Sequence, residues 1–464
     1  MKINIASNEV VHFIGIGGIG MSGLAQIMNN MGFKVQGSDL NTNKNTDRLI
    51  KAGIKVYLSH DKKNINKVTM VVISSAIKKS NCELIASKNK KIPIFKRGEV
   101  LANIVSLKKN IVVAGSHGKT TSTSLVANIL AKAGLDPTVI NGGVINSLKN
   151  TAHLGKGDWA VIESDESDGS FLKLPVTYSI VTNLDKEHLD FYGSFEKLKK
   201  SFHTFIEKTP TFGKAIVCLD DSNLKSLLLK CNSNNFLTYG FDKKSNYQIL
   251  NLKKNSNFST FDLCVKLIGS NTFKIKNIKV NLLGNHNVLN ATAGIAIALN
   301  IGIKTNYIKK ALEQFSGIQR RFTKIFSINK VDFYDDYAHH PTEINAVLNG
   351  AKDVYKKRKI VSVFQPHRYS RVKLLEKEFA QSFQLSDTVI LCPVYAAGEK
   401  MNYSFSQDAF SKLISKKSDT QVINIKNKNE LKIYIKKNLF RDEVVICMGA
   451  GNISNWIREI SIEL

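Results

Sequence analysis

The chain is poor in cysteine and groups none of the cysteines that it has. Its six cysteines are far apart among 464 residues, with no C-x-x-C pair and no companion histidines at the spacing of metal ligands. Cysteines of disulfide frameworks and zinc sites recur at short, regular spacings. Their dispersal indicates a protein of a reducing compartment.

Long apolar runs are also missing. The chain has no run of about 18 apolar residues, the length of a membrane-spanning helix. Its start, Met-Lys-Ile-Asn-Ile-Ala-Ser-Asn-Glu, lacks the continuous apolar core of a signal peptide. We therefore expect a cytoplasmic protein without membrane insertion.

Acidic residues are scarce relative to basic ones. The chain has 38 acidic and 66 basic residues, and a formal net charge of +28. Such an excess suits a protein that handles polyanions. The lysines are scattered, however, and many stand beside asparagines, as in Asn43-Lys44-Asn45. Because no aromatic-interleaved basic patch and no nucleic-acid module occurs, we expect no nucleic-acid binding.

The pattern that is present is that of α/β proteins. Short β-branched runs alternate with helical patterns, which is typical of parallel sheets with crossover helices. The length suffices for about three domains. The hydrophobic fraction of 43% and the charged fraction of 22% are ordinary for a globular protein.

A glycine loop from Gly115 to Thr121 follows the apolar run 111–113 and precedes the helical segment 122–133. In such a loop the backbone N–H groups turn toward a polyphosphate, Lys119 can reach the outer phosphates, and the Thr120 hydroxyl can hold Mg²⁺. The spacing G-x-x-G-K-T is shorter than the usual G-x-x-x-x-G-K-[ST], so generic NTPases fit less well. We predict an ATP site; the alternative is a glycine turn with an exposed lysine.

A second glycine loop lies nearer the N-terminus. Its G-x-G-x-x-G pattern follows the strand-like run 10–14, and a second strand ends at Gly37-Ser38-Asp39. This is the arrangement of dinucleotide-type sites, although the motif alone is weak. The loop suits a nicotinamide cofactor or the diphosphate of another nucleotide, with Ser38 and Asp39 near its sugar or base.

Carboxylates gather after the strand-like run 159–162. Four acids occur within six residues, from Glu163 to Asp168. They would repel one another unless a cation lay among them, so we predict Mg²⁺ coordination at this strand end, with Glu163 as the preferred ligand and Glu166 in reserve. The alternative is a solvated acidic turn. After the run 178–182, His188 could bind a second Mg²⁺ or play a structural part.

These segments resemble the Mur ligase family over most of the chain. The family's motifs occur in order as GIGGIGMSG at 15–23, GSHGKTT at 115–121, ESDESDGSFL at 163–172, NLDKEHLD at 183–190, GNHNVLN at 284–290, GIQRRF at 317–322, DDYAHHPTE at 335–343, QPHRYSR at 365–371 and YAAGE at 395–399. Any one motif could arise by chance, but this many in register are specific. The later motifs are most similar to the branch that adds L-alanine to UDP-N-acetylmuramate.

The resemblance implies an α/β fold with three domains. Residues 1–107 would form a Rossmann-like UDP-sugar domain, 108–316 a central P-loop-type ATP domain, and 317–464 a Rossmann-like domain for the amino acid and part of the nucleotide. The implied reaction phosphorylates the lactyl carboxylate of UDP-N-acetylmuramate with ATP. The amine of L-alanine then attacks the acyl phosphate. We expect a monomer or weak homodimer.

The resemblance also assigns residues to these ligands. For ATP it implies Gly115, Ser116, His117, Gly118, Lys119, Thr120, Thr121, His286, Asn287, Asn290, Arg321 and Asp336. For the UDP-sugar it implies Gly15, Gly17, Gly18, Gly20, Ser38 and Asp39. Mg²⁺ would be held by Thr120, Glu163 and His188, and the amino-acid pocket would be shaped by Tyr337, His339 and His340. The catalytic set would be Lys119, His188, His367, Arg368 and Arg371, with the last three clamping phosphate or carboxylate after domain closure.

Three positions depart from the family pattern. Ala338 stands where glycine is usual, so the loop there must accept a Cβ atom. Asn285 replaces a usual arginine, which removes one cation near the nucleotide. Phe202 takes the place of the lysine that is carbamylated in several relatives, so we expect no such modification.

Other functions remain open. A related ligase that adds a preformed tripeptide to the same UDP-sugar shares most motifs, whereas a folylpolyglutamate synthetase lacks the N-terminal glycine loop. A nicotinamide-dependent oxidoreductase or a nucleotide sensor would leave the glycine loop at 115–121, the acidic segment 163–168 and the group of His367, Arg368 and Arg371 unexplained.

Overall fold

The computed structural model describes residues 8–463 except 75, 149, 232–234, 256, 268, 270, 400–404 and 440–441. The described chain divides into two compact units. The first holds the residues up to Leu252 together with Phe261–Val280 and Leu289–Ser316. The second holds Lys253–Thr260, Asn281–Val288 and the chain from Gly317 onward.

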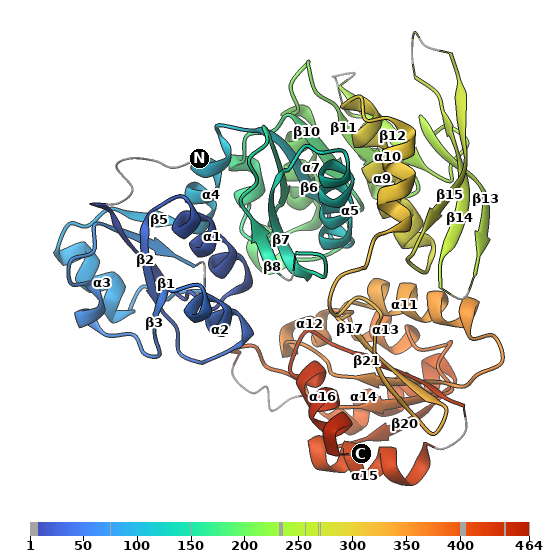
Figure 1. The fold of residues 1–464 in the computed structure, drawn as a ribbon. Coiled ribbons are helices and arrows are strands. Elements are labelled where there is room, and N and C mark those ends of the chain that lie inside the picture. Colours follow the sequence, from blue (N-terminus) through green and yellow to red (C-terminus); the bar gives the residue numbers. More distant parts are fainter. Residues whose placement is uncertain are drawn as a thin grey trace. The chain divides into compact units, whose positions relative to one another are not determined.

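A five-stranded parallel sheet opens the first unit, with strand order β3-β2-β1-β4-β5 (Figure 1). Its strands are β1 (Val10–Ile14), β2 (Lys34–Ser38), β3 (Lys55–Tyr57), β4 (Met70–Ile73) and β5 (Ile94–Lys96). The helical segments are α1 (Ile19–Asn30), α2 (Lys44–Lys51), the 3₁₀ turn η2 (Lys62–Ile65), α3 (Cys82–Asn89) and α4 (Arg97–Val105). The N-terminal glycine loop lies between β1 and α1.

A ten-stranded sheet follows in the order β15-β14-β13-β12-β11-β10-β6-β9-β7-β8. Its strands are β6 (Lys109–Ala114), β7 (Thr138–Ile145), β8 (Asn150–His153), β9 (Trp159–Glu163), β10 (Tyr178–Val181), β11 (Ala215–Cys218), β12 (Phe236–Gly240), β13 (Tyr247–Lys254), β14 (Ser259–Val265) and β15 (Phe273–Val280). In Figure 1 the strands β13 to β15 form a long ribbon at one edge. The helical segments are α5 (Lys119–Lys132), η3 (Ser170–Lys173), α6 (Leu189–Tyr192), α7 (Phe195–Glu207), α8 (Ser222–Leu228), α9 (Asn285–Asn300) and α10 (Thr305–Glu313).

The order of this sheet positions the predicted site. Strand β6 pairs in parallel with β9 on one side and with β10 on the other. Parallel strands end at the same edge, where α/β proteins bind their ligands. The phosphate loop after β6, the acidic segment after β9 and the segment after β10 therefore meet at one edge, although they are far apart in sequence.

The second unit contains a six-stranded sheet in the order β16-β17-β21-β18-β19-β20. Its strands are β16 (Thr323–Ile328), β17 (Val331–Asp336), β18 (Ile360–Phe364), β19 (Thr388–Leu391), β20 (Gln421–Asn424) and β21 (Val444–Met448). The helices are α11 (Pro341–Val354), α12 (Tyr369–Leu374), α13 (Glu376–Gln381), α14 (Gln407–Ser418), α15 (Lys428–Asn438) and α16 (Ile453–Glu463). All pairs are parallel except β16 with β17. Two separate apolar clusters pack against this sheet.

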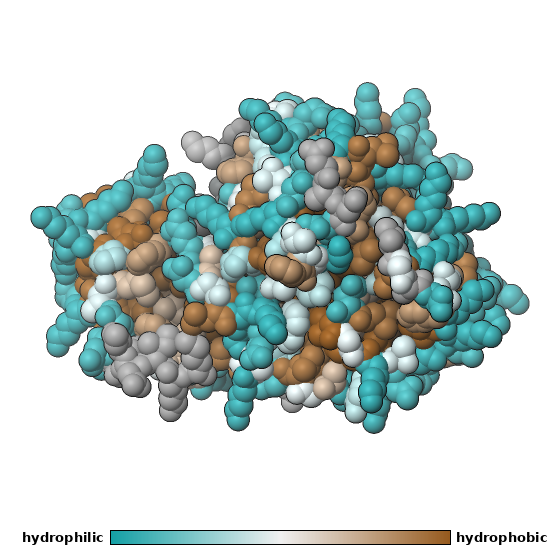
Figure 2. Space-filling view, turned by 90° about the horizontal axis from the view of Figure 1, so that it is seen from above, coloured by the Kyte–Doolittle hydropathy of each residue, from teal (hydrophilic) through white to brown (hydrophobic). Residues whose placement is uncertain are grey.

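The structure confirms the predicted mixed α/β class, with its mostly parallel sheets. The helix after the phosphate loop begins earlier than predicted, at Lys119 instead of residue 122. All six cysteines are free. None of the described helices is long and apolar enough to cross a bilayer. Hydrophilic side chains project over much of the face in Figure 2, as the scattered lysines led us to expect.

Candidate functional site

The phosphate loop requires glycine at two positions. Gly115 and Gly118 have φ angles of +138° and +80°, in the region that residues with a side chain rarely adopt. A Cβ atom at Gly115 would lie 2.0 Å from Oγ1 of Thr182, and one at Gly118 would lie 2.6 Å from Oδ1 of Asn290. Gly118 is also the N-cap of α5, so the loop leads directly into the positive end of a helix. Such an end favours a phosphate group.

The segment after β10 holds this loop in place. The Asn183 side chain accepts a hydrogen bond from the His117 amide at 2.7 Å, and the Thr182 hydroxyl donates to the His117 carbonyl at 2.6 Å. The Ser116 hydroxyl accepts from the Asp185 amide at 2.8 Å. These bonds fix the loop before any ligand binds, which lowers the entropy cost of ordering it around a phosphate.

Lys119 lies among carboxylates and carbonyls at the start of α5. Its Nζ atom is 2.7 Å from Oε1 of Glu166 and donates to the carbonyls of Gly115 and Ser116 at 2.5 and 3.1 Å. Burial alone would lower the pKa of Lys119, but Glu166 and neighbouring carboxylates raise it above the ordinary value. The ammonium group therefore stays charged at the site predicted for the outer phosphates.

Thr120 and Glu163 are brought together, as the predicted metal set requires. The Thr120 hydroxyl donates to Oε1 of Glu163 at 2.9 Å, and the Gly142 amide donates to Oε2 of the same carboxylate at 2.5 Å. A Cβ atom at Gly142 would meet this carboxylate at 2.6 Å. The strand β7 therefore positions Glu163 through a glycine that the sequence analysis did not single out.

His188 belongs to a second group of possible ligands. One ligand atom from each of Glu166, Glu187 and His188 lies within 4.8 Å of the others. Nε2 of His188 is 3.4 Å from Oε1 of Glu166 and 4.0 Å from Oε2 of Glu187. Burial lowers the pKa of His188, but the two glutamates outweigh this effect and raise it. Glu166 thus lies beside His188 and Glu187, a residue that the motifs did not single out, and which carboxylate binds Mg²⁺ stays a prediction.

These residues fit Mg²⁺. Oε2 of Glu166 is buried and makes no hydrogen bond to any described residue, which leaves an oxygen ligand available. Carboxylate and hydroxyl oxygens are the ligands that Mg²⁺ takes, usually with phosphate oxygens and water completing the shell. Glu163 with Thr120, and Glu166 with Glu187, each supply such oxygens next to the phosphate loop.

The four carboxylates of the acidic segment have separate partners in the structure, and Mg²⁺ coordination at this strand end stays a prediction. Glu163 accepts from Thr120 and Glu166 pairs with Lys119. Asp165 pairs with Arg97 at 2.9 Å, and Asp168 accepts from the Ser170 amide at 3.0 Å. Separate partners relieve the repulsion that the sequence suggested.

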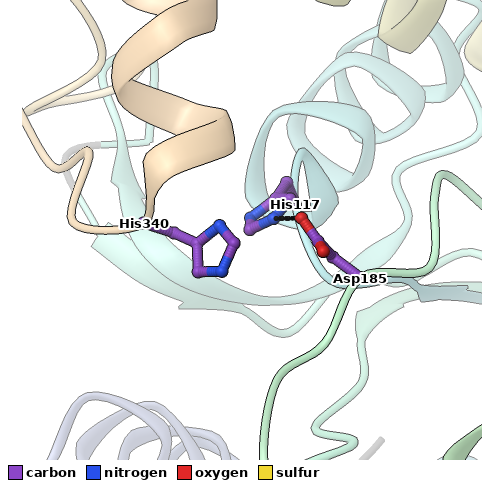
Figure 3. Close-up of side chains that lie close together, drawn as sticks. All are labelled: His117, Asp185 and His340. Carbon is purple, nitrogen blue, oxygen red and sulfur yellow. Dashed lines mark hydrogen bonds and ion pairs between the residues drawn. The ribbon is translucent and has the colours of Figure 1, made fainter. Parts of the chain in front are cut away.

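The His117 side chain lies beside a carboxylate at the same edge. Its Nε2 atom lies 3.3 Å from Oδ2 of Asp185, which Figure 3 marks with a dashed line. Figure 3 also labels His340, a residue of the second unit. Asn290 lies beside the loop in the first unit, where Oδ1 accepts a hydrogen bond from the Ser122 hydroxyl at 3.1 Å. Thr121 is buried in the first turn of α5.

The N-terminal glycine loop is packed closely by polar side chains. The Gly17 amide donates to Oδ2 of Asp39 at 2.8 Å. A Cβ atom at Gly17 would lie within 2.9 Å of Asp39, and one at Gly20 would lie 3.0 Å from Nη1 of Arg97. Gly15 has a φ angle of +82°, and Gly18 is the N-cap of α1. Arg97 therefore links this loop to Asp165 of the acidic segment.

The Ser38 hydroxyl is turned into the protein. Its Oγ atom donates to Oε2 of the buried Glu83 at 2.5 Å and lies 2.9 Å from Nδ1 of His60. The Ser38 carbonyl accepts from the Gly15 and Ile16 amides at 2.8 and 3.0 Å. Ser38 thus supports the glycine loop through its backbone, while its hydroxyl is bonded to Glu83; its place near the sugar or base of a nucleotide stays a prediction.

In the second unit, Asp336 lies at the end of β17 and is buried. Its carboxylate accepts hydrogen bonds from the Ala338 and Phe322 amides, both at 2.7 Å. Burial raises the pKa of Asp336 to about 6, although Arg321 opposes the shift. Burial and the charge of Arg321 lower the pKa of His286 to about 4. The side chain of Asn287 donates to the Leu283 carbonyl at 2.8 Å.

The residues predicted to shape the amino-acid pocket lie among aromatic rings. The Tyr337 ring lies 4.8 Å from the guanidinium of Arg320, and its centroid is 5.2 Å from that of His339. The His339 centroid is 5.9 Å from that of His367, which stacks on Tyr395 at 5.6 Å. His340 instead caps α11 through Nδ1, which accepts from the Thr342 amide at 3.3 Å. The two adjacent histidines thus have different neighbours.

His367, Arg368 and Arg371 gather after β18. Nη1 of Arg371 lies 3.4 Å from Nδ1 of His367, while the Arg368 amide donates to the Tyr395 carbonyl at 2.9 Å. Burial, His339 and the nearby arginines lower the pKa of His367 to about 3. His367 is therefore neutral at pH 7 and both arginines are cationic, which suits recognition of a phosphate or carboxylate.

The structure shows the surroundings of the three residues that depart from the family pattern. Ala338 is fully buried, and its backbone does not adopt the left-handed conformation, so its Cβ atom is accommodated. Asn285 is exposed at the start of α9. Phe202 is buried against Phe171, with ring centroids 5.3 Å apart, so an apolar contact occupies its position.

An α/β fold with a glycine loop at a helix N-terminus is typical of enzymes that handle nucleotide phosphates. Three family domains match the chain: the Mur ligase family catalytic domain over residues 10–109, the Mur ligase middle domain over 113–298 and the Mur ligase glutamate ligase domain over 320–451. The chain belongs to the Mur ligase family.

Individual relatives are similar over the whole length. The chain is 56% identical over 460 residues to the UDP-N-acetylmuramate–L-alanine ligase of Pelagibacter ubique, covering 99% of each. It is 41% identical to the enzyme of that name from Brucella anthropi, covering 100% of this chain and 98% of the relative. The crystal structure of UDP-N-acetylmuramate-alanine ligase from Thermotoga maritima superposes with a TM-score of 0.82 at 29% identity, covering 98% of both chains.

Proposed function

We propose that this chain is an ATP-dependent ligase that joins L-alanine to the lactyl carboxylate of UDP-N-acetylmuramate, in the synthesis of peptidoglycan precursors. The names of the full-length relatives support this substrate pair. The observation that carries the chemistry is the meeting of the phosphate loop with two sets of carboxylates at one sheet edge. ATP and the lactyl carboxylate are both anions and repel each other. Mg²⁺ held by these carboxylates would reduce that repulsion.

The three parts of the chain bind different ligands in this proposal. Residues 1–107 bind the UDP-sugar, with its diphosphate at the loop of Gly15, Gly17, Gly18 and Gly20 and with Asp39 beside it. Residues 108–316 bind ATP and 317–464 bind the amino acid and part of the nucleotide. Asp336 is suited to a ribose hydroxyl because its carboxylate lies at the C-terminal end of β17, where α/β folds bind ligands. We further propose a cytoplasmic monomer or weak homodimer.

In the first step a lactyl carboxylate oxygen attacks the γ-phosphorus of ATP, and the bond to the β-phosphate oxygen breaks to release ADP. The transferring group carries negative charge that must be stabilised. Lys119 supplies one positive charge, and the amides at the start of α5 supply oriented dipoles. Bound Mg²⁺, held by Thr120 with Glu163 and by Glu166, Glu187 and His188, would neutralise further charge.

In the second step the amine of L-alanine attacks the carbonyl carbon of the acyl phosphate. The carbon–oxygen bond to phosphate then breaks, and the nitrogen loses a proton. Arg368 and Arg371 are suited to bind the leaving phosphate or the alanine carboxylate as fixed cations. The rings of Tyr337, His339 and His367 form a cluster, which we propose to contact the small amino acid.

The test is phosphate release from ATP by the purified chain with Mg²⁺. Release that requires both UDP-N-acetylmuramate and an amino acid supports a ligase. Release without either, or nucleotide binding with no turnover, would instead support an ATPase or a nucleotide sensor and contradict the proposal.

A further inference from the structure

A mixed group of metal-ligand side chains lies away from the phosphate loop. One ligand atom from each of His203, Glu207 and Cys231 lies within 4.8 Å of the others, and all three residues are half-buried. His203 and Glu207 are four residues apart on α7, so they share one face of that helix. Cys231 lies just after α8. The spacing of these residues does not predict the group, because the histidine and cysteine are 28 positions apart.

The backbone around these residues is well anchored. On α7, Phe202 and Ile206 are buried and turn the neighbouring His203 and Glu207 toward the outside of the core. On α8, Leu227 and Leu228 are buried, and the Cys231 amide donates to the Leu228 carbonyl at 3.2 Å. The two helices pack against each other. The core therefore fixes α7, which carries two of the ligands, and α8, which leads to the third.

The His203 ring is already oriented by the backbone. Its Nε2 atom lies 3.1 Å from the carbonyl oxygen of Lys230, the residue before Cys231. A histidine that binds a metal through one nitrogen commonly donates its other N–H to a carbonyl, which fixes the ring. The Lys230 carbonyl is placed to do this when Nδ1 binds a metal.

We propose that His203, Glu207 and Cys231 form a binding site for a zinc-like transition-metal ion, with water as the fourth ligand. Sulfur, imidazole nitrogen and carboxylate oxygen are the ligands that Zn²⁺ takes in tetrahedral sites. Bond lengths of about 2.0–2.3 Å place such ligand atoms roughly 3.3–3.8 Å apart, so small side-chain rotations close the present spacing. Mg²⁺ prefers oxygen ligands and is not expected here.

Charge and protonation are consistent with this ion. A thiolate and a carboxylate carry two negative charges that offset a divalent cation. A metal binds the thiolate form of cysteine, so binding releases the thiol proton to solvent and weakens as the pH falls. The bound ion would tie the end of α7 to the end of α8, away from the reacting phosphate.

Cobalt reports directly on such a site. The full-length protein is freed of metal with a chelator, saturated with Mg²⁺ and titrated with Co²⁺, while the thiolate-to-cobalt charge-transfer absorbance is followed. We expect one equivalent of Co²⁺ to give this band and Zn²⁺ to abolish it. The oxygen ligands at the phosphate loop cannot produce the band.

Variants assign the band to the three residues. Cys231→Ser should abolish it, and His203→Gln and Glu207→Gln should each weaken Co²⁺ binding at least about tenfold. The control Cys82→Ser removes an exposed cysteine and should leave the band unchanged. Retained Mg²⁺-dependent turnover would show that each variant is folded. The proposal is overturned if no band forms, if the band persists in Cys231→Ser, or if binding does not depend on His203.

Discussion

Lys119 and Glu166 form a partly buried ion pair in which Nζ lies 2.7 Å from Oε1. The same carboxylate oxygen is 3.4 Å from Nε2 of His188. One carboxylate thus holds the cation of the phosphate loop and a candidate metal ligand together. This contact couples the loop after β6 to the segments after β9 and β10.

Removing the Lys119 cation should impair chemistry more than substrate binding. We expect Lys119→Ala to lower turnover at least about 10²-fold, because a charge that stabilises a transferring phosphoryl group contributes a few kcal/mol. UDP-N-acetylmuramate binding should be nearly unchanged in calorimetry. Lys132→Ala, an exposed site on the same helix, is the control. Unchanged turnover in Lys119→Ala would refute the ATP assignment.

Glu163 should determine the Mg²⁺ requirement. We expect Glu163→Gln to raise the Mg²⁺ concentration for half-maximal turnover at least about tenfold, since the variant loses a charged ligand beside Thr120. The measurement is a Mg²⁺ titration of turnover at saturating ATP. Asp168→Asn, in the same acidic segment but bonded to the Ser170 amide, should leave the titration unchanged. Equal shifts in both variants would argue against a specific ligand role.

Arg371 should act on the reaction rather than on ATP binding. It belongs to the second unit and the phosphate loop belongs to the first, and gating by domain motion is usual in such enzymes. We expect Arg371→Ala to lower turnover about 10²-fold while ATP affinity, measured without the other substrates, changes far less. The same holds for Arg368→Ala. Lys373→Ala, exposed on α12, serves as control. A loss of ATP affinity as large as the loss of rate would show that these arginines bind ATP in the ground state.

Glu83 should make stability depend on acid pH. Burial alone would raise its pKa, but the nearby His12 and hydrogen bonds from Ser38 and Asn64 lower it from 4.5 to about 2. The folded state therefore binds this proton less tightly than the unfolded state. The resulting stabilisation, on the order of 3 kcal/mol, is present above about pH 4.5 and is lost as the pH falls toward 2. Urea unfolding of wild type and Glu83→Gln across this range should show a shallower pH dependence in the variant; equal slopes would contradict this assignment.

The parts of the site that could be predicted from sequence are local. Gly118, Lys119 and Thr120 are adjacent, and their spacing is set by one loop and one helix start, so the motif alone places them. Glu187 and Arg97 were missed because their roles depend on which strands are neighbours in a sheet. The same holds for Ser38, whose hydroxyl is directed inward by a carboxylate 45 positions away.

Side-chain direction was the second unpredictable feature. Four acids in one short segment suggested a shared cation, but their carboxylates point to different partners. The acidic segment begins at the last residue of β9 and continues beyond the strand, so its successive side chains diverge. Arg97 and Lys119 approach these side chains from different elements. Sequence spacing cannot report the position of those cations.

Selection among amino acids should be modest. We expect L-alanine to be preferred over glycine and L-serine by about 10 to 200-fold in kcat/KM, because a methyl group in an apolar pocket contributes only about 1–3 kcal/mol of discrimination. Competition assays with mixed amino acids would measure the ratio. A preference above about 10⁴-fold would indicate a hydrogen-bonded or edited selection that this account does not include.

The most direct test of the proposed reaction is the mass of its product. The purified chain is incubated with ATP, Mg²⁺ and UDP-N-acetylmuramate, and then with either L-alanine or the L-Ala-γ-D-Glu-diaminopimelate tripeptide. The account predicts a product heavier than UDP-N-acetylmuramate by one alanine residue, together with stoichiometric ADP and phosphate. A tripeptide adduct without an alanine adduct would contradict the substrate assignment.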